Sequence, residues 1–135
     1  MVKNNIILKT GKRKTAVARV MIVKGSGNIN VNNQDLNSYV PNALLNLKVR
    51  EPLMISGLDK KYDFKVNVCG GGQSSQVDAI RQGIARALVE ETGNDDLKKK
   101  FLEYDRSMLI TDTRFKEMRK PNTSKARAKR QKSYR

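Results

Sequence analysis

The last eleven residues space their cations with small or polar side chains, in the order Lys125-Ala-Arg-Ala-Lys-Arg-Gln-Lys-Ser-Tyr-Arg135. Residues 114–135 hold 10 Lys and Arg and a single acid, Glu117, which gives +9 of the chain's net charge of +15. Cations at this density neutralise phosphates and release the counterions of a nucleic acid, and the ring of Tyr134 can stack on a base. We therefore predict that this segment binds RNA. The alternative is a solvated end that only aids solubility.

A second group of cations, Lys12, Arg13 and Lys14, precedes the first strongly apolar segment, and Arg19 follows within it. No Asp or Glu occurs before Asp35, so no carboxylate in this part of the chain offsets the charge. A short solvated arm is the default interpretation of such a run. Because the positive charge is uncompensated, we favour an anchor for RNA phosphates.

A glycine-rich turn, Gly70-Gly-Gly-Gln-Ser-Ser-Gln76, precedes a long helical pattern. Backbone N–H groups at the start of a helix bind anions, so Gly71 and Gly72 are candidates for holding an RNA phosphate. The turn lacks the Lys of a P-loop and does not match G-x-G-x-x-G, which argues against nucleotide chemistry. A tight connection from strand to helix is the equally weighted alternative.

Composition argues against an enzyme. The chain has no His and one Cys, Cys69, so it lacks the commonest general base and cannot form an intrachain disulfide. No two carboxylates share a spacing typical of an acid/base or metal pair. We expect no catalytic residue, no metal and no cofactor, and we expect Cys69 to be a small buried side chain. A nucleic-acid chaperone and a small kinase are the rival functions.

Hydrophobic patterns predict a small body with strands before and between helices. Beta-branched residues predict a strand over 15–23, and the turn that follows predicts its return as a hairpin at 29–31. Alternation predicts another strand over 62–68, with one buried face. A helix should begin near Pro41 and end at Pro52, with at most a short continuation to Gly57.

The longest helical pattern has one apolar stripe, formed by Val77, Ile80, Ile84 and Leu88. Ser74 or Ser75 should cap this helix and Gly93 should end it; Arg81 and Arg86 lie off the stripe and should face solvent. Asp95 or Asp96 should cap a shorter helix. We predict an α+β fold, a two-layer α/β sandwich, over residues 1–111. Residues 112–135 should form an extended basic tail that is disordered alone, because it has too few apolar side chains to offset the entropy of ordering.

Apolar runs are short, the one near the start spanning only Ile6–Leu8, so we expect no membrane segment and a soluble, intracellular protein. Four motifs then carry a specific resemblance. In order along the chain they are Thr10-Gly-Lys-Arg-Lys-Thr-Ala-Val-Ala-Arg-Val20, Gly70-Gly-Gly72, Gln76 with Ala79–Leu88, and the end Lys125–Arg135. Together they resemble the family of the ninth small-subunit ribosomal protein, and the ending Gln131-Lys-Ser-Tyr-Arg135 resembles its archaeal and eukaryotic branch.

The resemblance implies a fold like the second domain of ribosomal protein S five, including a left-handed βαβ crossover against the usual hand. It implies a place in the head of the small subunit of the cytoplasmic ribosome, bound to rRNA and to neighbouring ribosomal proteins. The tail would reach the peptidyl site, where Lys132 and Arg135 contact the anticodon stem-loop of the tRNA. The residues expected to bind rRNA are Lys12, Arg13, Lys14, Arg19, Gly71, Gly72, Lys120, Lys125, Arg127, Lys129 and Arg130.

Overall fold

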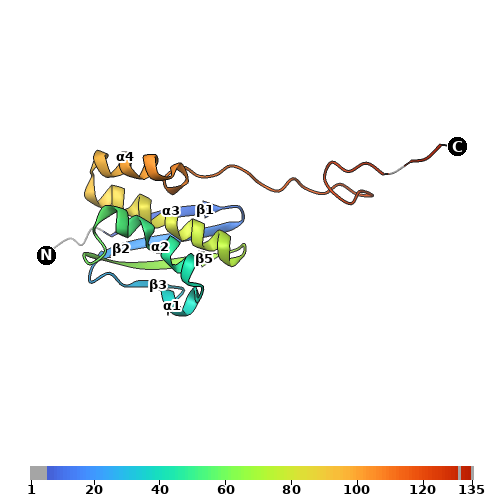
Figure 1. Ribbon diagram of the computed structural model, residues 1–135. Helices are drawn as coiled ribbons and strands as arrows, with labels where there is room; N and C mark the ends of the chain where they lie inside the picture. The colour runs from blue at the N-terminus through green and yellow to red at the C-terminus, as the bar shows by residue number, and fades with distance from the viewer. Residues whose placement is uncertain (1–5, 131, 135) are drawn as a thin grey trace.

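The computed structural model describes residues 6–130 and 132–134, which form an α+β body followed by an irregular C-terminal segment (Figure 1). The predicted class is thus confirmed. A mixed five-stranded sheet has the strand order β1-β2-β5-β3-β4. Its strands are β1 (Ile7–Arg13), β2 (Ala16–Lys24), β3 (Ile29–Val31), β4 (Gln34–Asp35) and β5 (Tyr62–Cys69). The helices are α1 (Leu36–Tyr39), α2 (Ala43–Ser56), α3 (Gln73–Thr92), α4 (Asp95–Tyr104) and the short 3-10 helix η1 (Arg106–Met108).

Lys12 and Arg13 of the first basic cluster belong to a strand, which the residue pattern did not predict. β1 pairs antiparallel with β2, with Ile7 opposite Ile22 and Arg13 opposite Ala16, so Lys12 and Arg13 end the first arm of a hairpin. Lys14 makes the turn with φ of 51°, in the left-handed region. The charged and polar residues of β1 hide its strand pattern, because the strand gains its stability from pairing and from the helix above it.

The predicted hairpin between 15–23 and 29–31 is wrong. β2 pairs antiparallel with β5 instead, and β3 pairs parallel with the far edge of β5. The carboxylate of Asp63 in β5 accepts hydrogen bonds of 2.8–2.9 Å from the backbone N–H groups of Ser26, Gly27 and Asn28. These bonds hold the connection that carries the chain across β5 to β3. The left-handed sense of the β3-α2-β5 crossover stays a prediction.

Helix α2 continues through Pro52, where the sequence analysis expected it to end. Pro52 and Leu53 are buried in the core, so packing offsets the hydrogen bond that proline cannot donate. The helix ends at Gly57, which caps it in the left-handed region with φ of 68°. The short continuation that we expected is therefore a full turn.

Helix α3 is the central helix, and its predicted stripe is confirmed, since Val77, Ile80, Ile84 and Leu88 are fully buried. Its C-cap is Gly93, as predicted. Its N-cap is Gly72, without a side-chain hydrogen bond, so the prediction of a serine cap is wrong. The prediction that Asp95 or Asp96 caps α4 is also wrong, because the cap is Asn94 and the two acids occupy the first turn of the helix.

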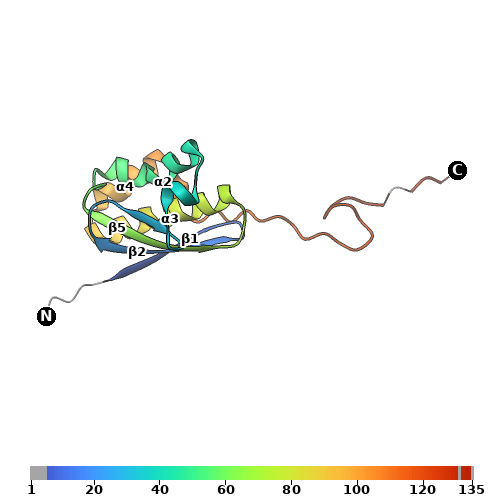
Figure 2. The same ribbon diagram turned by 90° about the horizontal axis from the view of Figure 1, so that it is seen from below.

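The helices pack against one face of the sheet, and Figure 2 shows this face from the side. In the described part of the chain no element covers the other face, where Leu8 is 55% and Val23 41% exposed. Cys69 lies on this uncovered face and is exposed, so the prediction of a buried thiol is wrong. The alternation of β5 explains the error, because Val68 points to the core and its neighbour must point away.

Candidate nucleic-acid interface

One end of the body gathers the hairpin turn and the glycine turn. Lys14 and Thr15 form the tip of the β1–β2 hairpin, and Gly70 and Gly71 follow β5 directly beside it. A Cβ on Gly70 would lie 2.4 Å from the Thr15 carbonyl oxygen. Figure 1 shows that this is also the end from which the C-terminal segment leaves the body. The structure therefore brings together two of the predicted sites that lie 55 residues apart.

The glycines of this turn have different roles. Gly70 and Gly71 have φ of 77° and 65°, a left-handed conformation that glycine adopts without strain, so the tight-turn interpretation holds for both. Gly72 has φ of −99°, and a Cβ there would meet no atom within 4 Å. Its backbone does not require glycine. No side chain caps the start of α3, so its first N–H groups have no side-chain partner there, as an anion site requires.

The cations of the hairpin differ in what they contact. Lys14 is exposed at the tip. The Lys12 ammonium lies 5.1 Å from the centre of the Phe115 ring, a cation–π contact. Arg13 is half-buried and binds the carboxylate of Asp112 through its guanidinium. Of the three cations predicted to bind phosphates, Lys12 and Lys14 are exposed, whereas Arg13 is half-buried. Its ion pair with Asp112 also attaches the C-terminal segment to the body.

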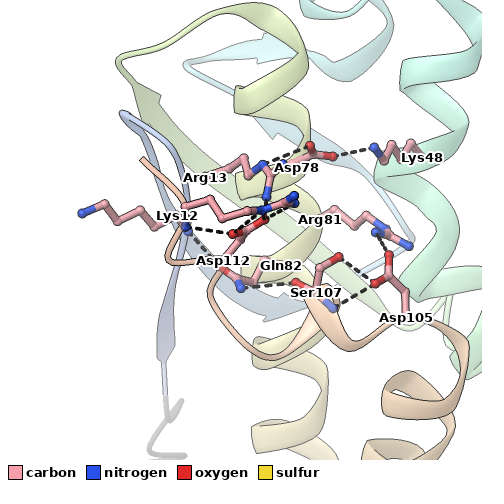
Figure 3. Close-up of a pocket in the computed structure, with 10 residues that line it drawn as sticks. Lys12, Arg13, Lys48, Asp78, Arg81, Gln82, Asp105, Ser107 and Asp112 are labelled. Atoms are coloured by element: carbon pink, nitrogen blue, oxygen red, sulfur yellow. Dashed lines mark hydrogen bonds and ion pairs between the residues drawn. The ribbon is translucent and has the colours of Figure 1, made fainter. Parts of the chain in front are cut away.

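Arg81 and its partners form a polar cluster beside the hairpin, around a cavity of about 310 Å³ (Figure 3). The Arg81 guanidinium pairs with Glu51 at 2.6 Å and with Asp105 at 2.7 Å, and its side chain is only 7% exposed. The prediction that Arg81 faces solvent is wrong. Burial alone would raise the pKa of Asp105, but hydrogen bonds from Arg81 and Ser107 lower it below the ordinary value. The cluster is therefore a set of ion pairs that joins α2, α3 and η1.

Gln82 fastens the same region to the hairpin. It is 3% exposed, and its side-chain oxygen accepts a hydrogen bond of 2.9 Å from the backbone N–H of Lys12. Its amide nitrogen donates to the Ser107 carbonyl at 3.3 Å. Through these two hydrogen bonds the buried Gln82 side chain links β1 to η1.

The prediction that Arg86 faces solvent is also wrong. Its guanidinium donates to the carbonyl oxygens of Thr10 and Leu109, at 2.8 and 3.0 Å, and to the Thr111 hydroxyl at 2.9 Å. Burial lowers its pKa from the ordinary value, but the group stays protonated. Arg86 thereby holds the residues after η1 against β1.

Asp112 continues this attachment. It accepts hydrogen bonds from the backbone N–H of Arg114 at 2.9 Å, from the Arg114 guanidinium at 2.7 Å, and from Arg13. These bonds hold the pKa of Asp112 well below its ordinary value. We call the residues from Leu109 to Phe115 the tail anchor. Sequence patterns gave no signal for it, because its partners are distant in the chain and lack periodicity.

The remaining predicted residues do not join the basic end of the body. Arg19 is exposed on the uncovered face of the sheet. Arg127 pairs with Glu117 at 2.8 Å, and the other predicted tail cations are exposed in a segment without helix or strand; they are Lys120, Lys125, Lys129, Arg130 and Lys132. Arg135 lies outside the described residues. Within those residues, no helix is long and apolar enough to cross a membrane, and no cluster of side chains suits a metal.

Comparison with known proteins assigns the chain to a family. The model of the family "Ribosomal protein S9/S16" matches residues 11–135. The chain is 47% identical to the small ribosomal subunit protein uS9 of Picrophilus torridus, over 98% of this chain and 99% of the relative. It is 44% identical to the uS9 proteins of Methanococcus maripaludis and Halobacterium salinarum, over 96% and 93% of this chain and 98% and 96% of theirs.

The matches identify the chain, with its small α+β body and its cations at one end, as a structural, non-enzymatic ribosomal protein. These matches extend over nearly the whole chain. The chain belongs to the ribosomal protein S9/S16 family, and its relatives named above are archaeal.

Proposed function

We propose that this protein is a structural constituent of the small-subunit head that binds rRNA through the basic end of its body. The observation that supports this is the clustering of the Lys14 tip, the open start of α3 at Gly72 and the origin of the tail at one end (Figure 1). Phosphate contacts from such a surface fix position and orientation, while specificity comes from the shape of the RNA.

Each part of this end has its own role. Lys12 and Lys14 neutralise phosphates, and Arg13 adds a guanidinium that is already oriented by Asp112. The backbone N–H groups at the start of α3, beside Gly71 and Gly72, hold one further phosphate oxygen. Arg19 contacts rRNA separately, from the uncovered face of the sheet.

The tail, residues 112–135, extends this surface away from the body 1–111. Its cations Lys120, Lys125, Arg127, Lys129 and Arg130 contact rRNA, and the segment becomes ordered only on binding. Lys132 and Arg135 contact the anticodon stem-loop of the tRNA in the peptidyl site, where guanidinium and ammonium groups pair with its phosphates. Neighbouring proteins of the head are further partners, in the ribosome of the cytoplasm.

The test measures binding of the full chain to a transcribed head-domain rRNA across a salt series. The variant Lys12→Gln/Lys14→Gln removes two exposed charges, one at the hairpin tip and one near the end of β1. The slope of log K against log salt should fall by about 2, because each lost phosphate contact reduces it by about 1. The control Lys99→Gln/Lys100→Gln removes two exposed charges from α4 and should leave the slope unchanged. Equal slopes for both variants would refute the proposal.

A free nucleic-acid chaperone is distinguished by sedimentation. A subunit constituent stays with small subunits after a moderate-salt wash, whereas a chaperone bound only by non-specific charge is released.

A further inference from the structure

The face of the sheet opposite the helices is uncovered in the described part of the chain (Figure 2). It carries a shallow depression of about 560 Å³. Alternate residues of four strands line it, and the six that matter here are Leu8, Arg19, Met21, Asn30, Lys65 and Asn67. The strand register places them as neighbours, with Leu8 opposite Met21, Met21 opposite Lys65, and Arg19 opposite Asn67. We call this surface the open face.

The cations of the open face have no carboxylate partner among the described residues. Arg19 and Lys65 are exposed and form no ion pair there, in contrast to Arg13 and Arg81 on the other side of the sheet. Arg19 and Lys65 are diagonal neighbours on paired strands, about 7–8 Å apart at the backbone. Such a pair can contact two phosphates of one strand.

Acids near the open face are already occupied. The Asp63 carboxylate binds three backbone N–H groups, which lower its pKa, and it is therefore anionic but internally bonded. Asp35, at the outer edge, caps α1 through the N–H of Asn37. The charge presented at the depression is thus positive.

Two amides lie in the same depression. Asn30 is opposite Lys65 in the parallel pair, and Asn67 is opposite Arg19. Both are exposed, and neither side chain makes a hydrogen bond within the described residues. An amide can donate to and accept from a ribose 2′-hydroxyl or the edge of a base.

We propose that the open face is a second RNA-docking surface, which receives the shallow minor groove of an rRNA helix. That groove is wide and displays 2′-hydroxyls between two phosphate backbones. Arg19 and Lys65 then pair with phosphates, Asn30 and Asn67 bond 2′-hydroxyls, and Leu8 and Met21 pack on riboses. The inference rests on the proposed binding of rRNA and adds to it a site and an RNA geometry on the side of the sheet away from the polar cluster.

Charge and composition favour RNA over a protein at this face. Protein interfaces take much of their affinity from buried aromatic anchors. The residues of β1, β2 and β5 that face outward contain no aromatic side chain, since Tyr62 and Phe64 alternate onto the helical side. Unpaired cations beside free amides instead suit phosphates and 2′-hydroxyls.

A thiol moved into the depression provides a direct probe of this face. Cys69 itself is exposed, but it directly precedes the glycine turn of the basic end, so RNA bound at that end would also protect it. In the variant Cys69→Ser/Leu8→Cys the thiol replaces Leu8, which is 55% exposed and lines the depression. The rate at which iodoacetamide alkylates this thiol is measured with the full chain, free and saturated with head-domain rRNA. We expect at least a tenfold slower rate in the complex. The control Cys69→Ser/Lys99→Cys moves the thiol to α4 and should react equally fast in both states.

A charge variant provides the second measurement. Arg19→Gln/Lys65→Gln should reduce the salt slope by about 2, with a melting temperature equal to that of the original chain. Asn67→Leu should weaken binding without changing the slope, because it removes no charge. The control is again Lys99→Gln/Lys100→Gln.

The outcomes separate the two proposals. If the chain shows no salt-dependent binding of this rRNA, the proposed function fails and this inference fails with it. If the chain binds but the thiol of Cys69→Ser/Leu8→Cys stays reactive in the complex and the slope of Arg19→Gln/Lys65→Gln is unchanged, the open-face inference is overturned together with the separate Arg19 contact, while binding through the basic end stands. Protection of this thiol in whole subunits but not by rRNA alone would assign the face to a protein and also overturn the inference.

Discussion

The substitution Gly11→Ala, which adds one methyl group to β1, should strongly destabilise the body. Gly11 lies where β1 crosses α3, and its ideal Cβ would be 1.9 Å from the Ala79 carbonyl oxygen and 2.7 Å from the Gly83 nitrogen. Real Cβ atoms essentially never lie within 3.0 Å of such a neighbour. The strand or the helix must therefore move by about 1.1 Å, to lengthen the 1.9 Å contact to 3.0 Å. The obstacles are backbone atoms of a helix and cannot rotate away.

The cost follows from this displacement. Overpacking costs about 1–3 kcal/mol, and Gly11→Ala belongs at the upper end because the movement also lengthens the 2.9 Å bond from Lys12 to Gln82. For a body of this size, about 3 kcal/mol lowers the melting temperature by roughly 12 °C. Circular dichroism during heating measures it.

Thr10→Ala is the matched control, since Thr10 is exposed on the opposite face of the same strand. It should change stability by less than about 1 kcal/mol. A melting temperature of Gly11→Ala within about 2 °C of the original, as for the control, would refute the close approach of β1 and α3.

Three further changes have defined outcomes. Arg81→Met should cost about 1.5–3 kcal/mol in denaturant unfolding, because it removes the buried partner of Glu51 and Asp105, whose own side chains are partly solvated; a loss below about 0.5 kcal/mol contradicts this. The folded-state pKa values of Asp63 and Asp105 are lowered, so their contribution to the free energy of unfolding is present above about pH 4 and is lost as the pH falls through the folded-state values. Asp63→Asn should therefore make stability, measured by urea titration, fall less steeply on the acid side. Deletion of residues 132–135 should leave subunit assembly intact and weaken tRNA binding in the peptidyl site; collapsed assembly with unchanged tRNA affinity would make the tail a structural element.

Sequence patterns predicted the elements that have strong periodicity. The stripe on α3 and the alternation of β5 are long and regular, so burial of Ile80 and Phe64 follows from spacing alone. The glycine stops at Gly57 and Gly93 were equally visible, because a left-handed cap favours one residue type.

Pairing and burial of charge could not be predicted in the same way. β1 is a strand because β2 and α3 lie beside it, and its own residues Lys9, Thr10 and Lys12 do not indicate one. Arg81 and Arg86 occupy polar positions of a helix, and only the arrival of η1 and the tail anchor from later in the chain buries them. Such partners are a product of tertiary structure and carry no local signal.

The candidate interface shows the same division. The cations and the glycine turn were identified from residue type, but their meeting at one end depends on the hairpin and on β5 ending beside it. The open face was missed, because Lys65, Asn67 and Asn30 are unremarkable until the sheet places them together.

The central claim is that the basic end of the body and the tail are ordered against rRNA. A cryo-electron microscopy map of the assembled small subunit tests it most directly. The account predicts Lys14 and the start of α3 within hydrogen-bond distance of phosphate oxygens, and the tail traced along RNA toward the peptidyl site. A tail folded back on the body, with this end facing solvent, would contradict it.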